Sequence, residues 1–225
     1  AGQSFCNGCQ MGRLQDSTGE SSCKSCPAGY FADSTWSSFC KPCNIGQFQD
    51  STGKSTCKSC ELGKSTILPA QTACQPCAPG LYGDTDDTTR CSLCNPGSYQ
   101  DEAGQTACKQ CTVGKYQHAF GQRLCFLSGK GGYVDKEGMT GQKSCAPGTY
   151  QPNEGATSCL VASPGFFVYN NDKTRQQECT AGTYQPRERS GSCLAASPGF
   201  FVSDNGKTTQ QECAEGQYQH LSGQT

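Results

Sequence analysis

The spacing of the cysteines constrains the fold of this chain more than any other feature. From Cys6 to Cys125 successive cysteines are separated alternately by 3 and 14 residues, so the chain has a period of 17 residues. Counted from Cys9, twelve complete repeats and one partial repeat follow each other without an insertion. A fixed period of this kind indicates an array of small repeats in which each repeat packs against its neighbours.

The other fixed features can be described by their place in the repeat. We number the repeats 1 to 13 and the places 1 to 17, so that Cys9 is place 1 of repeat 1. Place 4 is glycine in every repeat, and place 6 is aromatic in eleven of the thirteen. We expect the glycine to adopt a positive φ or to admit a neighbouring backbone, and the aromatic ring to cover the disulfide and bury most of its surface. Turn sequences such as QDSTG, from Gln15 to Gly19, then join two short strands.

Composition excludes a conventional hydrophobic core. Leu, Ile and Val together number 17 in 225 residues, whereas there are 20 cysteines. So few aliphatic side chains predict a small disulfide-rich fold of short β-hairpins and turns, arranged as an elongated repeat solenoid or rod without a conventional core. The net charge of −1 gives no basic surface for nucleic acid, and no apolar run is long enough for a membrane span. A cysteine content of this kind is typical of extracellular or cell-surface proteins.

The CxxC motifs have three interpretations: a zinc site, a redox site or a disulfide framework. After Cys125 the cysteines disappear in couples that are 14 residues apart, and the couples are replaced by Ser128 with Gln142, Ala162 with Gln176, and Ala196 with Gln210. The two cysteines of one zinc or redox motif would be expected to disappear together instead. Residues that are lost jointly are plausible bonding partners, because losing one alone leaves a free thiol. The pattern therefore favours a disulfide framework.

This reasoning predicts nine disulfides between residues 14 apart. They are Cys9–Cys23, Cys26–Cys40, Cys43–Cys57, Cys60–Cys74, Cys77–Cys91, Cys94–Cys108, Cys111–Cys125, Cys145–Cys159 and Cys179–Cys193. For Cys6 and Cys213 we expect partners outside the given sequence, and we expect the chain to be part of a longer array. Two regions follow: residues 1–127 with a bridge in every 17-residue repeat, and residues 128–225 with a bridge in every second repeat, a period of 34.

Each cysteine with its following glycine and aromatic forms a local motif. The segments CPAGYF, CAPGLY, CNPGSY and CAPGTY, which begin at residues 26, 77, 94 and 145, resemble the ephrin-receptor-like cysteine-rich repeat and, more distantly, the modules of tumour-necrosis-factor receptors. The resemblance implies an extracellular disulfide ladder. Such repeats occur in receptor ectodomains, secreted adhesive proteins and components of extracellular fibres. Repeats after Cys125 depart from the pattern because alternate bridges are missing.

No residues form a catalytic pattern, so we expect no enzyme activity and no cofactor. Place 8 holds His118 and His220, which we interpret as surface turn residues. It also holds a set of aspartates for which turn formation is favoured over a calcium-binding carboxylate row: Asp16, Asp33, Asp50, Asp84, Asp101 and Asp135. Trp36, the single tryptophan, stands at a place where most repeats have glycine.

The segment ASPGFFV occurs at residues 162–168 and 196–202, in repeats that lack a bridge. One interpretation is that Phe166, Phe167, Phe200 and Phe201 compensate by packing for the missing bond. The other is that one Phe of each couple faces outward and forms an assembly surface. Expected partners are further copies or neighbouring extracellular proteins, and exposed residues such as Ser17 and Thr18 are candidates for O-linked glycans.

Two functions from different classes agree with these features. The first is an extracellular structural repeat region, meaning a stalk, spacer or fibre subunit stiffened by disulfides. The alternative is the ligand-binding ectodomain of a cell-surface receptor or adhesion protein. The uniform spacing favours the structural role, because a binding site needs a few repeats that differ from the rest.

Overall fold

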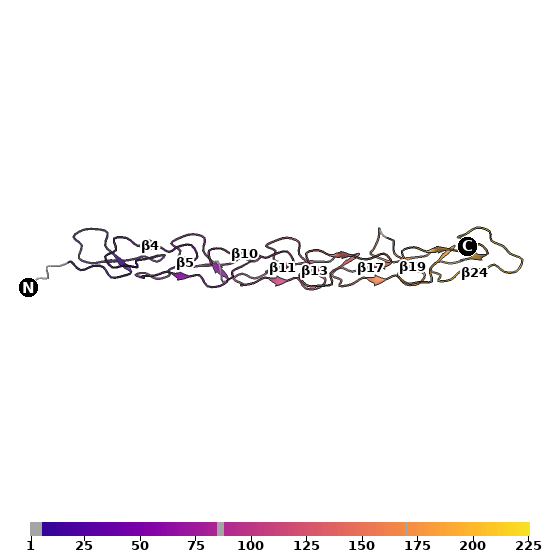
Figure 1. Cartoon of the computed structure of the whole chain (residues 1–225), viewed down its shortest axis with the longest axis horizontal. Coiled ribbons are helices and arrows are strands. Elements are labelled where there is room, and N and C mark those ends of the chain that lie inside the picture. Colours follow the sequence, from indigo (N-terminus) through magenta and orange to yellow (C-terminus); the bar gives the residue numbers. More distant parts are fainter. Residues whose placement is uncertain (1–5, 85–87, 170) are drawn as a thin grey trace, which may run out of the picture. The chain divides into compact units, whose positions relative to one another are not determined.

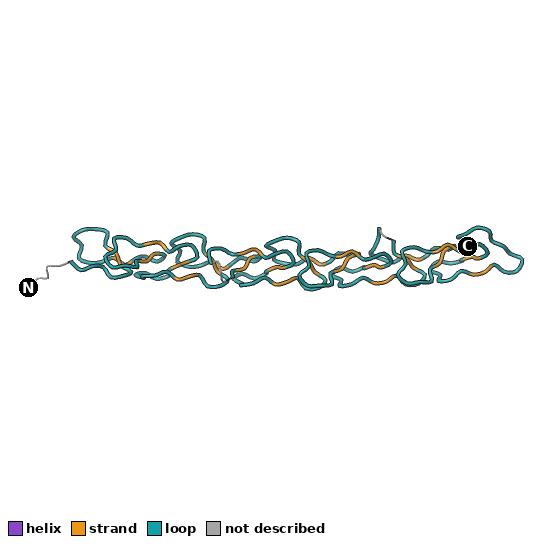
Figure 2. Tube along the Cα trace, viewed as in Figure 1, coloured by secondary structure: helices purple, strands orange, loops and turns teal. Residues whose placement is uncertain are grey.

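A computed structural model describes residues 6–84, 88–169 and 171–225. All regular secondary structure of these residues consists of two-residue strands separated by turns (Figures 1 and 2). Within the described ranges no helix is long and apolar enough to cross a membrane. The prediction of small disulfide-rich hairpins is confirmed.

Each of the first twelve repeats contains one antiparallel hairpin, in which places 5 and 6 pair with places 17 and 16. Repeats 1 to 6 contain β1 (Arg13–Leu14) with β2 (Lys24–Ser25), β3 (Tyr30–Phe31) with β4 (Lys41–Pro42), β5 (Gln47–Phe48) with β6 (Lys58–Ser59), β7 (Lys64–Ser65) with β8 (Gln75–Pro76), β9 (Leu81–Tyr82) with β10 (Ser92–Leu93), and β11 (Ser98–Tyr99) with β12 (Lys109–Gln110). Repeats 7 to 12 contain β13 (Lys115–Tyr116) with β14 (Phe126–Leu127), β15 (Gly132–Tyr133) with β16 (Lys143–Ser144), β17 (Thr149–Tyr150) with β18 (Leu160–Val161), β19 (Phe166–Phe167) with β20 (Gln177–Glu178), β21 (Thr183–Tyr184) with β22 (Leu194–Ala195), and β23 (Phe200–Phe201) with β24 (Gln211–Glu212).

The chain divides into two compact units. The first comprises Ala1–Asn95, Tyr99–Lys109 and Phe120–Leu124, and the second comprises Pro96–Ser98, Gln110–Ala119 and Cys125–Thr225. Both units are built from the same hairpin and the same contacts between repeats. The elongated form and the division into residues 1–127 and 128–225 stay predictions.

Backbone hydrogen bonds join each repeat to the next. The N–H of place 1 donates to the carbonyl of place 4 in the preceding repeat at all twelve junctions, over 2.8–3.0 Å, as from Cys26 to Gly12. Place 4 donates in turn to place 7 of the following repeat, as from Gly29 to the carbonyl of Gln49 over 2.8 Å. A two-residue hairpin is unstable alone, so these bonds complete the structure of each repeat.

Place 4 also explains why repeats contact their second neighbours. Gly80 has a φ of 89°, and the carbonyl of Gly121, two repeats later, lies where a Cβ on Gly80 would be. Gly114 and Gly155 make the same contact in the second compact unit. Within each unit the odd-numbered repeats therefore stack on one another, and so do the even-numbered repeats. We call these stacks the odd row and the even row.

The interior is built from places 1 and 7. At place 1, Cys26 and Cys94 are fully buried, and at place 7 Gln117 and Val134 are fully buried. The aromatic residue at place 6 is partly exposed but has most of its surface buried in every repeat that has one except repeat 13, so the expectation that it buries most of its surface is confirmed for these repeats. Place 6 is less buried than place 7 because neighbours on a strand point to opposite sides, and place 6 lies beside its cross-strand neighbour at place 16.

Candidate functional site

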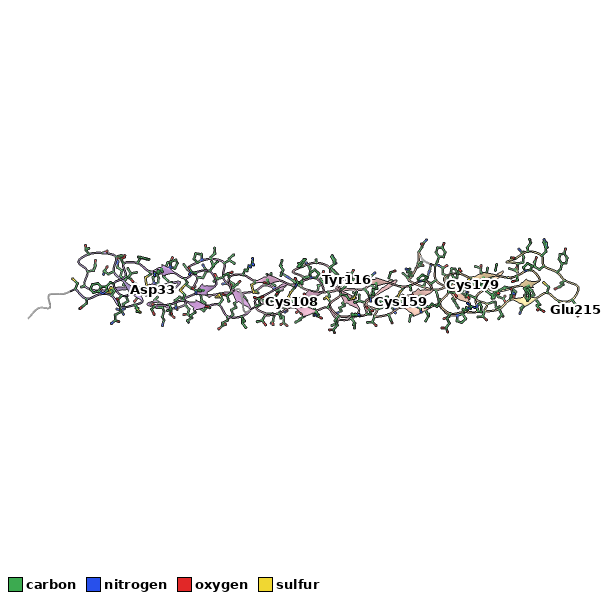
Figure 3. All side chains as sticks on the ribbon, in the orientation of Figure 1. Asp33, Cys108, Tyr116, Cys159, Cys179 and Glu215 are labelled. Carbon is green, nitrogen blue, oxygen red and sulfur yellow. A yellow bond between two sulfur atoms is a disulfide. The ribbon has the colours of Figure 1, made fainter. Side chains whose placement is uncertain are left out.

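Nine disulfides connect place 1 to place 15 and form the most regular feature of the molecule. Their Cα atoms are 5.6–5.8 Å apart and their sequence separation is 14 in every case. The structure thus brings together both members of each expected pair, and Figure 3 shows the sulfur–sulfur bonds of Cys108, Cys159 and Cys179. The two cysteines of a CxxC belong to different bonds. Cys6 is exposed and Cys213 is half-buried, and neither forms a disulfide within the described residues.

A hydrogen bond crosses the loop in the three repeats without a bridge. Gln176, at place 15, accepts a bond from the backbone N–H of Ser163 at place 2 over 2.8 Å, and Gln210 accepts one from Ser197 over 2.8 Å. Gln142 accepts the equivalent bond from Gly129. The place 1 residues of these repeats are all fully buried: Ser128, Ala162 and Ala196. The glutamine amide therefore holds the loop at the point where other repeats have a sulfur bridge.

The four phenylalanines of the ASPGFFV segments lie in β19 and β23, and all are half-buried. Their cross-strand neighbours are the polar residues of β20 and β24. The fully buried apolar residues of these repeats are instead Ala162 with Val168 and Ala196 with Val202. An assembly surface formed by Phe166, Phe167, Phe200 and Phe201 stays a prediction.

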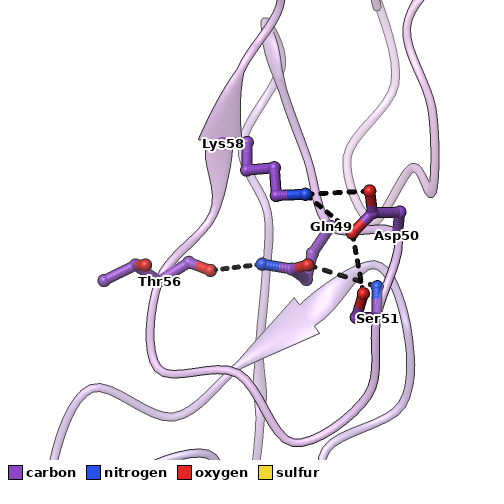
Figure 4. A network of polar contacts seen from close by, with 5 residues as sticks. All are labelled: Gln49, Asp50, Ser51, Thr56 and Lys58. Atoms are coloured by element: carbon purple, nitrogen blue, oxygen red, sulfur yellow. Dashed lines mark hydrogen bonds and ion pairs between the residues drawn. The ribbon is translucent and has the colours of Figure 1, made fainter.

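A buried glutamine at place 7 clamps the loop, and sequence reasoning missed it. Gln49 is 2% exposed; its Nε2 donates to the carbonyl of Thr56 over 2.7 Å, and its Oε1 accepts from the N–H of Ser51 over 3.2 Å (Figure 4). The same two bonds recur at Gln15, Gln100, Gln151 and Gln185. Glutamine occupies place 7 in seven of the thirteen repeats, and this recurrence is the signal that could have revealed the clamp.

Aspartate at place 8 forms an ion pair with lysine at place 16. Asp50 and Lys58 are 2.8 Å apart, and the same pair is formed by Asp16 with Lys24, Asp33 with Lys41, Asp101 with Lys109 and Asp135 with Lys143. The hydrogen bond from the lysine lowers the pKa of each of these five carboxyl groups. The aspartates thus join the two ends of the hairpin loop. No group of three metal-binding side chains lies together among the described residues.

The two histidines and the tryptophan that the sequence singled out each contact a neighbouring residue. His118 stacks on Phe126, with ring centres 5.7 Å apart, so an aromatic couple takes places 8 and 16 in repeat 7. Trp36 takes the place of a glycine with a φ of 66°, and its exposed ring lies against the backbone of Gly8. His220 lies near Tyr218, with ring centres 6.1 Å apart.

The hairpins, the bridges and their constant spacing define a cysteine-rich repeat. Residues 29–70 and 80–118 match the family described as tyrosine-protein kinase ephrin type A/B receptor-like. Together with the disulfide ladder, the match confirms the expected resemblance of these two segments to ephrin-receptor-like cysteine-rich repeats. No curated protein matches the chain. Repeats of this family and many disulfides are typical of extracellular domains.

Proposed function

We propose that this chain is a structural repeat region of an extracellular protein, acting as a stalk, spacer or fibre subunit. The observation that supports this role is the hydrogen bond from place 1 to place 4, which recurs at all twelve junctions, bridged or not. A scaffold requires that the junctions between repeats are alike, whereas a ligand-binding site requires a few repeats that differ from the others. The proposal involves no catalytic step and no cofactor.

The energetics of the repeat suit a load-bearing role. Each disulfide closes a loop of about 15 residues, for which the chain-entropy estimate is about 3 kcal/mol. This stabilisation is distributed along the chain rather than concentrated in one core. Local damage to one repeat then leaves the bridges of its neighbours intact, as in other nearest-neighbour arrays.

The proposal is tested by shortening the array in its natural protein. Deletion of residues 145–178 removes two repeats, one bridged and one unbridged, and keeps every later repeat on its row. We expect the shortened protein to reach the extracellular material in normal amounts, because repeats 8 and 11 present the same junction atoms. Deletion of residues 145–161 is the matched control, since it moves every later repeat to the other row.

Immunogold electron microscopy of the source material provides the readout. Label distributed along extracellular assemblies, for both the natural and the 145–178-deleted protein, is the expected result. Label confined to separate cell-surface particles, together with loss of a bound ligand on deletion of residues 145–178, would contradict the structural role. The receptor-type ectodomain would then be the better description.

A further inference from the structure

Exposed apolar side chains gather on the odd row of the second compact unit. They lie on β14, β18 and β22, which are the second strands of repeats 7, 9 and 11. Phe126, Leu127, Leu160, Val161 and Leu194 are 44–50% exposed, and Ala195 is also exposed. We call these six residues the odd-row stripe.

The even row of the same unit has no such surface among its described strands. At the same places β16 has Lys143–Ser144, β20 has Gln177–Glu178 and β24 has Gln211–Glu212. Hairpin architecture alone therefore does not require apolar residues here. The difference between the rows indicates that the odd-row stripe has a role of its own.

The ion pair of the hairpin is replaced on this row by one aromatic couple and two apolar couples. Repeats 1 and 3, also odd-numbered, have Asp16 with Lys24 and Asp50 with Lys58. Repeats 7, 9 and 11 have at these places His118 with Phe126, Pro152 with Leu160, and Pro186 with Leu194. Both members change in each case, so no acidic or lysine side chain remains at places 8 and 16 of this surface.

Direct stacking sets the interval between the three hairpins. The side chain of Leu127 in repeat 7 lies against Gly155 in repeat 9. The carbonyl of Arg189 in repeat 11 lies against Gly148 in repeat 9. The stripe therefore presents apolar strands at equal sequence intervals of 34 residues.

We infer that the odd-row stripe binds the same stripe of a second copy of this chain, in antiparallel orientation, and this inference rests on the proposed structural role. A two-fold axis through repeat 9 places repeat 7 of one copy opposite repeat 11 of the other. The equal intervals allow all three hairpins to meet at once. An uncharged stripe also brings no like charges together when it meets itself.

The exposed area is sufficient for a weak specific interface. Even at the roughly 200 Å² of an aromatic side chain, the half-exposed members present at most about 500 Å² per copy. Two copies then bury at most about 1,000 Å² in total, which is the size of a weak, transient interface. Association in the micromolar range is the expected strength, and many copies along an assembly would add their contacts.

Sedimentation equilibrium of the oxidised chain tests the inference from about 1 μM to about 1 mM, which spans the expected range of Kd. Leu160 lies in the central repeat, so L160E and L160K each place like charges opposite one another across the axis. Each variant alone should weaken association at least about tenfold, because two like charges must then be buried together. An equimolar mixture of L160E and L160K should restore it. The matched controls are Q177E and Q177K, which have the same place on the even row.

Any of three results would overturn the inference. One is a chain that stays monomeric over the whole concentration range. The others are equal weakening by L160E and Q177E, and no recovery in the mixture, with the nine disulfides intact by peptide mapping. If the stripe fails these tests while deletion of residues 145–178 is tolerated, the structural role stands and only the self-association is wrong.

Discussion

At the scale of single residues, glutamine has two uses in this chain. At place 7 a buried glutamine joins two backbone groups of one loop, and at place 15 a glutamine substitutes for a bonded cysteine. Both uses depend on the amide: at place 7 it donates and accepts, and at place 15 its oxygen accepts. The spacing predicts Gln142, Gln176 and Gln210 as replacements of cysteine. Their hydrogen bond is not predictable from the spacing, because it depends on the direction of the backbone N–H at place 2.

Removal of the place 7 clamp should loosen its loop. Gln100 is 1% exposed and bonds the carbonyl of Ala107 and the N–H of Glu102. The variant Q100L has a similar volume but leaves both backbone groups without this partner, so local opening should become easier by about 1–3 kcal/mol. Hydrogen exchange of residues 101–108 measures this, and Q75L, at an exposed site, is the control. Unchanged exchange in Q100L would show that the clamp contributes nothing.

Acidification should break the ion pairs in a defined direction. The hydrogen bond from Lys58 lowers the folded-state pKa of Asp50 below its ordinary value. The contribution of the pair is thus fully present above the unfolded-state pKa and is lost as the pH falls through the folded-state pKa. A carboxyl-carbon NMR titration should show a low pKa for Asp50 that returns toward the ordinary value in K58M. The variant K54M, in the same loop, should leave it low; equal effects of K54M and K58M would contradict the pairing.

At the scale of the hairpin, sequence reasoning predicted the strands and turns because they follow from glycine and turn-residue chemistry within one repeat. It did not predict that the place 4 glycine contacts the repeat two positions later in the chain. A 17-residue period indicates that neighbours pack, but the twist between repeats decides whether the first or second neighbour is reached. The deep burial of place 7 was missed for a related reason: this place is usually glutamine, which was interpreted as part of a turn.

Three glycine substitutions separate backbone strain from packing. Gly80 has a positive φ and a carbonyl in the way of a Cβ, Gly19 has a φ of 81° and open space, and Gly141 has open space without a positive φ. The positive φ should cost G19A roughly 1–2 kcal/mol, and G80A should cost more because the carbonyl of Gly121 must also move. G141A should be tolerated. Thermal unfolding of the three oxidised variants gives the order, and a G80A variant as stable as G141A would refute the stacking contact.

The unbridged repeats should accept a bridge. Ala162 keeps the place 1 hydrogen bond to Gly148, over 3.0 Å, so the backbone resembles that of a bridged repeat. The double variant A162C/Q176C should therefore form a disulfide, which stabilises the repeat by about 3 kcal/mol. Non-reducing peptide mapping detects the bond. The matched variant A162S/Q176S removes the glutamine bond without adding a bridge and should exchange its amides faster than the natural chain.

At the scale of the whole molecule, the three unbridged repeats all belong to the even row, whereas the bridged repeats 9 and 11 belong to the odd row with the apolar stripe. The loss of bridges was visible in the sequence, but its confinement to one row was not. That property depends on which repeats stack. Function was predictable only to the level of an extracellular repeat, because repeated residues describe a scaffold and contain no chemistry that names a partner.

We expect the region before Cys125 to resist exchange and heat better than the region after Tyr133, because bridges occur there in every repeat rather than in every second one. Gly97 and Gly165 form a matched couple of probes: each N–H donates to a place 7 glutamine carbonyl over 2.7 Å, but repeat 10 lacks a bridge. Native-state hydrogen exchange should be faster at Gly165. Equal protection would instead show that Gln176 and Val168 fully replace the disulfide.

The stacking of each repeat on its second neighbour also has a consequence for how a gene for such a protein can lengthen. Duplication of one repeat moves every later repeat to the other row, so the bridged row and the odd-row stripe would be interrupted. Copying two repeats together preserves both. Residues 145–178 and 179–212 are closely alike: they begin with CAPGTYQP and CTAGTYQP, and both end with QQE. This architecture therefore permits the array to lengthen by duplication of two repeats at a time.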